Sequence, residues 1–454
     1  MIRIEGQPIL TAAEMRAAEE RAAPTPDAMY ALMERAGGSV ADTVRRLAAG
    51  AEVLILCGPG NNGGDGYVAA TALAGAGHPV RIAATGEPLT HSARRARAAW
   101  SGPVGRLDRA APAPILVDAL FGTGLTCPLD EAFAKPLHAL ARAARLRIAV
   151  DLPSGVATDD GAVPSAPFRF DLTLALGALK PSHLLQPAAR YMGEVRVLDI
   201  GVPTPSAATA LARPVLPEPG PDSHKFTRGL VLVIAGAMPG AAALAAEAAA
   251  HAGAGYVLLI DGGSAGPHAI VRRPWSPDAL DDARVGAVVV GPGLGRDGQA
   301  RDRFAVAFGS QHPLVIDGDA LGLLALDYVR PAPTILTPHA GEFDRLFGAG
   351  EGGKIARARA AARRSDAVVV FKGADTVIAA PDGRVIVGTS PSYWLSTAGT
   401  GDVLAGACGA MLASGLESFT AAAAAVWLHG EAARRLGPAF LADDLAGALS
   451  AARS

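Results

Sequence analysis

The feature that most constrains the fold is a pattern that occurs twice: short apolar runs alternate with segments of helical length. In the first half the runs are residues 53–57, 80–84, 115–117, 148–150, 172–176 and 195–198. In the second half they are residues 230–235, 257–260, 288–290, 314–316 and 368–371. Strands that alternate with helices form mainly parallel sheets covered on both faces. The sequence therefore predicts an α/β fold in each half.

A proline-rich segment separates the two halves. Four prolines fall within residues 212–222, and proline disfavours both helices and central strands. We expect a domain over residues 1–212, a linker over residues 213–222 and a domain over residues 223–454.

Two local signals add detail to these halves. The pattern Thr11-Ala-Ala-Glu14 is typical of a capping box and predicts a helix to about residue 23. Residues 378–386 predict a hairpin with Asp382-Gly383 at its turn.

Charge and cysteine content exclude several classes of protein. The 41 basic and 43 acidic residues nearly cancel, so no global field attracts nucleic acid or an anionic membrane. The three cysteines form no Cys-x-x-Cys pair, which excludes a disulfide framework and a thiolate zinc site. No signal peptide and no apolar run of membrane-spanning length is found. We expect a cytoplasmic protein with small-molecule ligands and no nucleic-acid or membrane partner.

A glycine-rich segment, residues 58–66, follows the first predicted strand and precedes a predicted helix over residues 67–76. Glycine lets backbone N–H groups approach a ligand, and the start of a helix favours an anion, so a phosphate or nucleotide site is plausible. Gly58, Gly60 and Gly63 also satisfy Gly-x-Gly-x-x-Gly, but residues 80–84 do not end in the acidic ribose ligand of a dinucleotide fold. A tight turn without a ligand is the alternative.

Polar residues follow two further strands of the first half. Asp118 ends one strand, and Asp151 and Ser154 follow the next. The carboxyl ends of parallel strands converge on one crevice, so these residues and Asn62 can meet there, and their oxygen atoms suit a hard cation. The alternative is that Asp118 and Asp151 only cap their loops.

The second half carries the more specific pattern. Gly399, Gly401 and Asp402 stand at a predicted helix start, where backbone N–H groups hold phosphate oxygens and Asp402 could take a proton from a hydroxyl. Lys372, one of only five lysines, lies in a turn after a strand. His339 lies in a further loop, over residues 337–342. It could have no ligand and be only a capping residue or a buried imidazole with its hydrogen bonds satisfied.

Two other glycine-rich segments are interpreted as decoys. Residues 348–355 nearly spell a Walker A loop, but Ile355 replaces the Ser/Thr that would hold magnesium, and we predict a flexible loop. Residues 293–298 repeat Gly-x-Gly-x-x-Gly without an acidic ribose ligand.

Taken together, these motifs resemble the bifunctional NAD(P)H-hydrate repair enzyme family. The motifs similar to its N-terminal epimerase domain are residues 11–15, 32–36, 58–66 and 151–155. The motifs similar to its C-terminal dehydratase domain are residues 291–295, 337–342, 372–376 and 399–402. The chain departs from the family pattern at Gly318 and at residues 390–394.

The resemblance implies a fold and two activities. The N-terminal domain would be a Rossmann-like three-layer α/β/α sheet that interconverts the R and S hydrates of NADH and NADPH with K⁺. The C-terminal domain would be a ribokinase-like α/β/α sheet. It would dehydrate the S form through a phosphorylated intermediate, at the expense of ADP or ATP with Mg²⁺. A homo-oligomer is also expected.

The resemblance also implies roles for individual residues. The K⁺ ligands would be Asn62, Asp118 and Ser154, and the catalytic residues Asp151 and Asp402. The hydrate contacts would be Asn61, Asn62, Gly63, Gly64, Asp65, Gly122, Thr123, Gly124 and Asp151 in the first domain, and Ala241, Gly295, His339 and Asp402 in the second. The nucleotide contacts would be Lys372, Gly373, Ala374, Asp375, Thr376 and Gly401.

Three other functions stay open at this point. The second domain could be a kinase for a vitamin precursor, fused to a Rossmann-like binding module, since kinases share the Gly-x-Gly-Asp chemistry. The first domain could be a binding module without catalysis, although the intact segment Asn61–Asp65 argues against this. An ordinary NAD-dependent dehydrogenase is disfavoured by the missing ribose acid.

Overall fold

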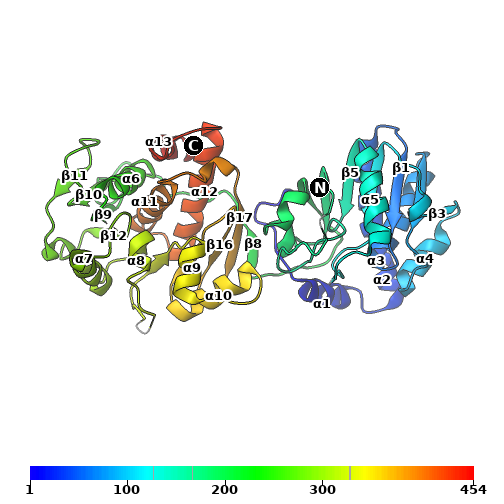
Figure 1. Ribbon diagram of the computed structural model, residues 1–454, viewed down its shortest axis with the longest axis horizontal. Coiled ribbons are helices and arrows are strands. Elements are labelled where there is room, and N and C mark those ends of the chain that lie inside the picture. Colours follow the sequence, from blue (N-terminus) through cyan, green and yellow to red (C-terminus); the bar gives the residue numbers. More distant parts are fainter. Residues whose placement is uncertain (126, 166, 327–328) are drawn as a thin grey trace. The chain divides into compact units, whose positions relative to one another are not determined.

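The computed structural model describes residues 1–125, 127–165, 167–326 and 329–454, and the chain divides into two compact units, Met1–Ala210 and Leu211–Ser454. Each unit is a sheet with helices packed on it (Figure 1), so the α/β prediction is confirmed in both halves. In the described ranges no helix combines the length and the apolar character needed to cross a bilayer.

The sheet of the first unit is parallel throughout, in the order β3-β2-β1-β4-β5-β6-β7. Its strands are β1 (Val53–Cys57), β2 (Val80–Ala84), β3 (Val104–Arg106), β4 (Ile115–Ala119), β5 (Leu146–Val150), β6 (Leu172–Leu176) and β7 (Glu194–Leu198). The short edge strand β3 was not predicted, because its sequence Val-Gly-Arg is barely apolar. The chain reverses its direction across the sheet between β1 and β4, which is where ligands bind in such sheets.

Helices cover both faces of this sheet. They are α1 (Ala12–Ala22), α2 (Pro26–Ala48), α3 (Asn61–Gly75), α4 (His91–Ala99), α5 (Glu131–Ala143) and the 3-10 turns η1 (Leu107–Arg109), η2 (Pro181–His183) and η3 (Ala188–Tyr191). Along β1, Val53 and Ile55 pack with residues of α2 and α3, whereas Leu54 and Leu56 pack with residues of α5. Burial on both faces explains the unbroken apolar runs. The predicted capping box of Thr11 and Glu14 starts α1, and β8 (Ala208–Ala210) lies beside Ile9.

One local prediction in this unit was wrong. Residues 61–66 were expected to form a loop before a helix, but they are the first turns of α3. The helix starts so close to the preceding turn that a Cβ on Gly63 would lie 1.9 Å from the Gly58 carbonyl oxygen. Glycine at this position therefore allows the helix backbone to approach the turn that precedes it.

The sheet of the second unit runs β11-β10-β9-β12-β13-β14-β15-β16-β17, parallel up to β15 and antiparallel beyond it. Its strands are β9 (Leu230–Ile234), β10 (Tyr256–Ile260), β11 (Val271–Arg273), β12 (Val285–Val290), β13 (Leu314–Ile316), β14 (Thr334–Leu336), β15 (Val368–Phe371), β16 (Asp375–Ala379) and β17 (Val385–Thr389). The last two strands are the predicted hairpin, with Asp382 and Gly383 between them. The three-residue strands β11 and β14 were not predicted.

The helices of this unit are α6 (Pro239–His251), α7 (Gly298–Gly309), α8 (Gly318–Leu321), α9 (Ala340–Phe347), α10 (Lys354–Ser365), α11 (Thr400–Ala413), α12 (Ser418–Leu436), α13 (Ala442–Ala452), with the 3-10 turns η4 (Pro277–Leu280) and η5 (Tyr393–Leu395). Val231 and Val233 of β9 share one core with α6, α11, α12 and α13. On β15, Phe371 stacks on Phe343 of α9, with ring centroids 3.9 Å apart. The predicted flexible loop over residues 348–355 is corrected at its end, because Lys354 and Ile355 begin α10.

Candidate active sites

The first candidate site lies at the carboxyl ends of β1, β4 and β5, where the strand order reverses. Asp118 is completely buried and its Oδ1 accepts a hydrogen bond from Ser154 Oγ at 2.8 Å, while its Oδ2 accepts one from Ser154 N at 2.9 Å. The Leu120 N–H also donates to Oδ1, at 3.1 Å. Burial raises the pKa of Asp118, and these hydrogen bonds oppose the rise. Asp118 and Ser154 are therefore brought together, as predicted.

Asn62 and Asp151 both lie next to Gly122. A Cβ on Gly122 would lie 3.2 Å from Asn62 Oδ1 and 3.3 Å from Asp151 Oδ2. The Asn62 Nδ2 atom is buried and has no hydrogen-bond partner among the described residues. An amide with an unused buried donor, next to a carboxylate oxygen, is a place where a polar ligand would complete the hydrogen bonding.

Asp151 forms hydrogen bonds with a lysine and a histidine. Its Oδ1 accepts a hydrogen bond from Lys180 Nζ at 2.5 Å, and its backbone oxygen lies 2.6 Å from His183 Nε2. His183 Nδ1 accepts from the Lys180 backbone N–H at 2.8 Å, so the ring proton is on Nε2 and points to Asp151. Burial lowers the pKa of His183 to about 4, and the positive charge of Lys180 adds to this effect.

Two more carboxyl groups lie in the same region. Burial raises the pKa of Glu19 to about 7, with a further contribution from the charge of Asp151, while Lys180 opposes the rise. Burial also raises the pKa of Asp65 well above its ordinary value, and Asp151 and Glu19 contribute to this shift. Asp65 was predicted as a substrate contact, whereas Glu19 was not predicted.

The remaining predicted residues of this site have different surroundings. Asn61 is exposed and its Oδ1 accepts a hydrogen bond from Thr90 Oγ1 at 2.6 Å. Gly64 packs on Met33, whose Cε atom would lie 2.5 Å from an added Cβ. Thr123 is half-buried, and an added Cβ on Gly124 would meet no atom within 4 Å.

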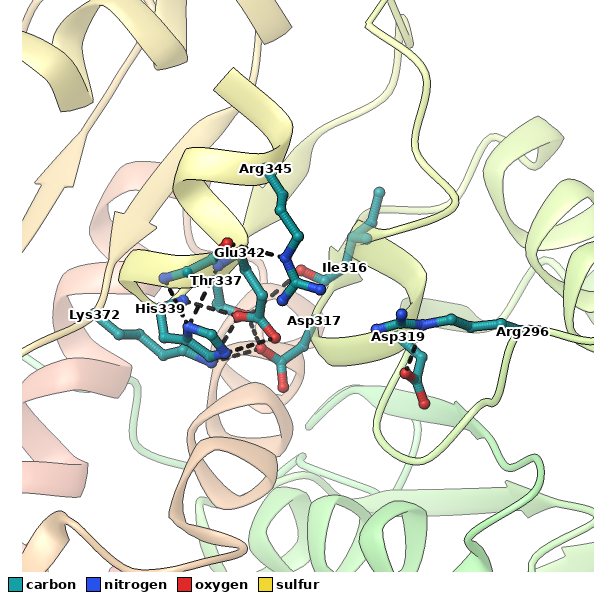
Figure 2. Close-up of polar contacts among 10 residues, drawn as sticks. Arg296, Ile316, Asp317, Asp319, Thr337, His339, Glu342, Arg345 and Lys372 are labelled. Atoms are coloured by element: carbon teal, nitrogen blue, oxygen red, sulfur yellow. Dashed lines mark hydrogen bonds and ion pairs between the residues drawn. The ribbon is translucent and has the colours of Figure 1, made fainter. Parts of the chain in front are cut away.

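The second candidate site is built at the ends of β13, β14 and β15. Asp317, directly after β13, accepts hydrogen bonds at Oδ1 from Thr337 Oγ1 at 2.6 Å and from Lys372 Nζ at 2.8 Å. Figure 2 shows these side chains converging, with Glu342 beside them. Burial by itself lowers the pKa of Lys372, but the carboxylates of Asp317, Glu342 and Asp402 raise it, and the net pKa lies above its ordinary value.

The start of α11 faces this cluster. Gly399 precedes the helix at φ 89°, a left-handed conformation that favours glycine. A Cβ on Gly401 would lie 3.4 Å from Lys372 Nζ, so the lysine charge is next to the free N–H groups of the helix. Asp402 is in the first turn. Burial raises the pKa of Asp402 to about 7, and Asp317 adds to the rise while Lys372 opposes it.

His339 is the N-terminal cap of α9. Its Nδ1 accepts hydrogen bonds from Gly341 N at 3.1 Å and Glu342 N at 3.3 Å, and Glu342 Oε2 accepts from the His339 N–H at 2.8 Å. These hydrogen bonds make His339 a capping residue, which was one of the two alternatives to a ligand contact. Its side chain is exposed, so the same residue can also meet a ligand.

Two loops complete the second site. Ala241, in the first turn of α6, lies next to the loop over residues 291–295, because a Cβ on Gly293 would be 3.0 Å from Ala241 Cβ. Gly295 N donates to Asp319 Oδ2 at 3.0 Å, and Arg296 pairs with the other oxygen of Asp319 (Figure 2).

The predicted nucleotide loop over residues 372–376 joins β15 to β16. Lys354 anchors this loop, because its Nζ donates to Asp375 Oδ1 at 2.7 Å and to the Lys372 carbonyl at 3.2 Å. Thr376 Oγ1 donates to the Gly373 carbonyl at 2.9 Å, and Ala374 accepts from the Ser390 N–H at 2.7 Å.

The chain is similar to known proteins over nearly its whole length. Residues 29–182 match the family model described as YjeF-related protein N-terminus, and residues 231–451 match the one described as NAD(P)H-hydrate dehydratase. The bifunctional NAD(P)H-hydrate repair enzyme of Salinibacter ruber is 36% identical over 513 residues, which cover 95% of this chain and 92% of that protein. The chain belongs to the bifunctional NAD(P)H-hydrate repair enzyme family.

A second relative and one solved structure are also similar to this chain. The protein of Mycobacterium tuberculosis with the same name is 39% identical over 421 residues, which cover 87% of this chain and 86% of that protein. The crystal structure of ADP/ATP-dependent NAD(P)H-hydrate dehydratase from Bacillus subtilis with ATP/Mg²⁺ is 30% identical, covers 52% of this chain and 93% of that chain, and has a TM-score of 0.47. The family resemblance and fold class predicted from the motifs are confirmed.

Several residues of these repair-enzyme sites were not singled out from the sequence as site residues. They are Glu19, Lys180 and His183 in the first unit, and Asp317, Thr337, Glu342 and Lys354 in the second. Lysine is scarce in this chain, with five in 454 residues, and this signal identified Lys372. The same signal could have found Lys180 and Lys354.

Proposed function

We propose that this chain repairs hydrated nicotinamide nucleotides in two steps. The first unit interconverts the R and S hydrates of NADH and NADPH, and the second dehydrates the S form at the expense of ADP or ATP. We assign the epimerase to residues 1–212 and the dehydratase to residues 223–454, with a linker between them. The observation that carries the proposal is that Asp402 lies in the first turn of α11 and that Lys372 Nζ lies next to Gly401 of the same turn.

The second site suits transfer of a phosphoryl group to a hydroxyl. Asp402 accepts the proton of the hydrate's hydroxyl as the terminal phosphoryl bond of the nucleotide breaks and a new P–O bond forms. Lys372 and the N–H groups at the start of α11 stabilise the charge on the phosphate oxygens. The ring nitrogen's lone pair then expels phosphate, and loss of a proton from the neighbouring carbon restores the dihydropyridine. The products are NAD(P)H, inorganic phosphate and a nucleotide shortened by one phosphate.

Among the described residues around Lys372, no group of three or more carboxyl or imidazole side chains could hold a metal ion without a ligand. A magnesium ion would therefore come to this site with the nucleotide and be held mainly by its phosphate oxygens. When bound, magnesium neutralises charge on the transferring phosphate.

The first site fits a potassium ion held by Asn62, Asp118 and Ser154. Asp118 is fully buried, and its contacts among the described residues are to Ser154 and the Leu120 amide, which carry no charge. A cation would balance this buried carboxylate, and the available donors are oxygen atoms. When bound, potassium supplies an electrostatic anchor for polar groups of the hydrate. Asp151 is the acid/base residue that we assign to the hydrated carbon.

Purified protein incubated with a mixed R/S hydrate pool tests both activities through the absorbance of reduced nicotinamide. With ADP or ATP the whole pool should recover its absorbance, and without nucleotide none should. Recovery of only the S fraction would refute the epimerase assignment. A stable phosphorylated product would favour the vitamin-precursor kinase instead. The cytoplasmic location and the homo-oligomeric state stay predictions.

A further inference from the structure

A single segment, which includes β6 and η2, fixes Asp151 at four points. The Asp151 N–H donates to the Leu174 carbonyl at 2.8 Å, and its Oδ1 accepts from Leu176 N at 3.2 Å and from Lys180 Nζ at 2.5 Å. The fourth contact is from His183 to the backbone oxygen. Asp151 has φ 64°, an uncommon conformation for a residue with a side chain, and these contacts hold it there.

Lys180 is the charged member of this segment, and it cannot reach a ligand itself. Only 1% of its surface is exposed. Besides Asp151, its Nζ donates to the carbonyls of Leu176 at 2.8 Å and Ala178 at 3.2 Å. All three ammonium protons are therefore used inside the protein. Any effect of Lys180 on the reaction has to pass through the groups that it faces, and Asp151 is the carboxylate with which it forms an ion pair.

The second carboxylate oxygen of Asp151, Oδ2, has no hydrogen bond in the described part of the chain and lies close to Gly122. Its Oδ2 lies 3.3 Å from the position of a Cβ on Gly122, and Asn62 Oδ1 lies 3.2 Å from the same position. One carboxylate oxygen is thus fixed by the lysine, and the second faces the site that we assign to the hydrate.

The groups that face Asp151 make a positive charge necessary. Asp65 of α3 and Glu19 of α1 are carboxyl groups close enough to affect one another and Asp151. His183 is neutral, because its Nδ1 accepts a hydrogen bond from the Lys180 backbone. Lys180 is the cation that faces these three carboxyl groups in the described contacts. Without it, these carboxyl groups would face one another with no positive charge shared among them.

We propose that Lys180 is a positioning residue of the epimerase: its ion pair with Oδ1 fixes the Asp151 carboxylate so that Oδ2 is directed at the hydroxyl of the hydrate. This inference rests on the proposed epimerase function. The carbon that inverts carries both the hydroxyl and the ring nitrogen. Asp151 takes the hydroxyl proton, the O–H electrons form a carbonyl, and the C–N electrons move to the ring nitrogen. Attack of that nitrogen on the other carbonyl face re-forms the C–N bond, and Asp151 returns the proton to oxygen.

The variant Lys180→Met tests this role, because it keeps the length and apolar part of the side chain and removes the charge. We expect kcat for epimerisation to fall about 100-fold or more, the scale of a lost general base, with KM within about threefold of wild type. Dehydration of pre-formed S hydrate should not change. Lys135→Met is the matched control, because Lys135 is exposed and pairs with Glu131 on the surface. A kcat within about threefold of wild type would overturn the proposal.

A double mutant separates positioning from packing. If Lys180 acts only through Asp151, then Asp151→Asn and the double variant Asp151→Asn/Lys180→Met should have the same kcat. A further loss in the double variant would contradict the proposal. This comparison also decides the question if Lys180→Met alone does not fold, because the double variant contains a neutral pair. A wild-type enzyme that dehydrates but does not epimerise would instead refute the proposed function.

Discussion

The Nζ atom of Lys372 lies 2.8 Å from Oδ1 of Asp317, although the two residues are 55 positions apart in the chain. Asp317 follows β13 and Lys372 follows β15, and β14 lies between these strands. The ion pair therefore fixes the lysine across the ends of three strands. There its charge lies next to the N–H groups at the start of α11, to which we assign the phosphate of the nucleotide.

Lys372→Ala should raise the nucleotide KM far more than the hydrate KM, because the lost charge acts on phosphate. The measurement is steady-state dehydration of S hydrate with either substrate varied. Lys225→Ala is the control, since Lys225 is an exposed lysine of the same unit. If the dependence on nucleotide concentration did not change, the loop over residues 372–376 would not be part of the nucleotide site.

Asp402→Asn keeps the size of the side chain and removes its basicity. We expect dehydration to slow by ~10²–10⁴-fold while both ligands still bind, as measured by single-turnover kinetics and calorimetry. Wild-type enzyme should release one inorganic phosphate for each hydrate repaired. Near-normal dehydration by the variant, or repair without nucleotide cleavage, would contradict this mechanism.

The dehydration rate should depend on pH near neutrality. The pKa of Asp402 is raised to about 7 by burial, and only the ionised carboxylate accepts a proton. The rate should therefore be highest above pH 7 and fall about tenfold per unit well below it. The profile of kcat/KM for S hydrate measures this dependence in the free enzyme. A flat profile between pH 5 and 8 would argue against Asp402 as the base.

Asp118→Ala should slow R-to-S conversion and leave dehydration of pre-formed S hydrate near normal. It removes the acceptor of the Ser154 and Leu120 N–H groups, and each buried donor left unpaired costs about 1–3 kcal/mol. Potassium should raise the thermal stability of the wild-type protein more than that of the variant. Equal loss of both activities would contradict separate sites in the two units.

Gly122→Ala should impair the epimerase with little effect on the fold. The new methyl group would lie 3.2 Å from Asn62 and 3.3 Å from Asp151, in the space that we assign to the hydrate. Gly75→Ala is the control, because Gly75 is the last residue of α3 and its methyl group would meet no atom within 4 Å. Epimerase kinetics and thermal unfolding of both variants make the comparison. If both variants had the same epimerase activity, the space beside Gly122 would not be part of the hydrate site.

The main architecture could be predicted from the sequence because it depends on local and composition signals. Strands such as β1 and β15 are buried on both faces, so every residue has to be apolar and the run is visible without an alignment. Short strands such as β14 leave no such signal. Residues 61–66 were placed in a loop because glycine disfavours helices, but tertiary packing at Gly63 outweighs that preference.

The sequence by itself determined two α/β units, the glycine segments and the polar residues at the strand ends. Only the tertiary structure decided which of these residues meet. Asp151 and Lys180 are 29 positions apart, and their contact follows from the pairing of β5 with β6. Asp317 and Lys372 meet because they follow β13 and β15, which have one strand, β14, between them in the sheet. Such contacts depend on strand order and burial, which hold charges together across long stretches of chain and leave no periodic pattern in the sequence.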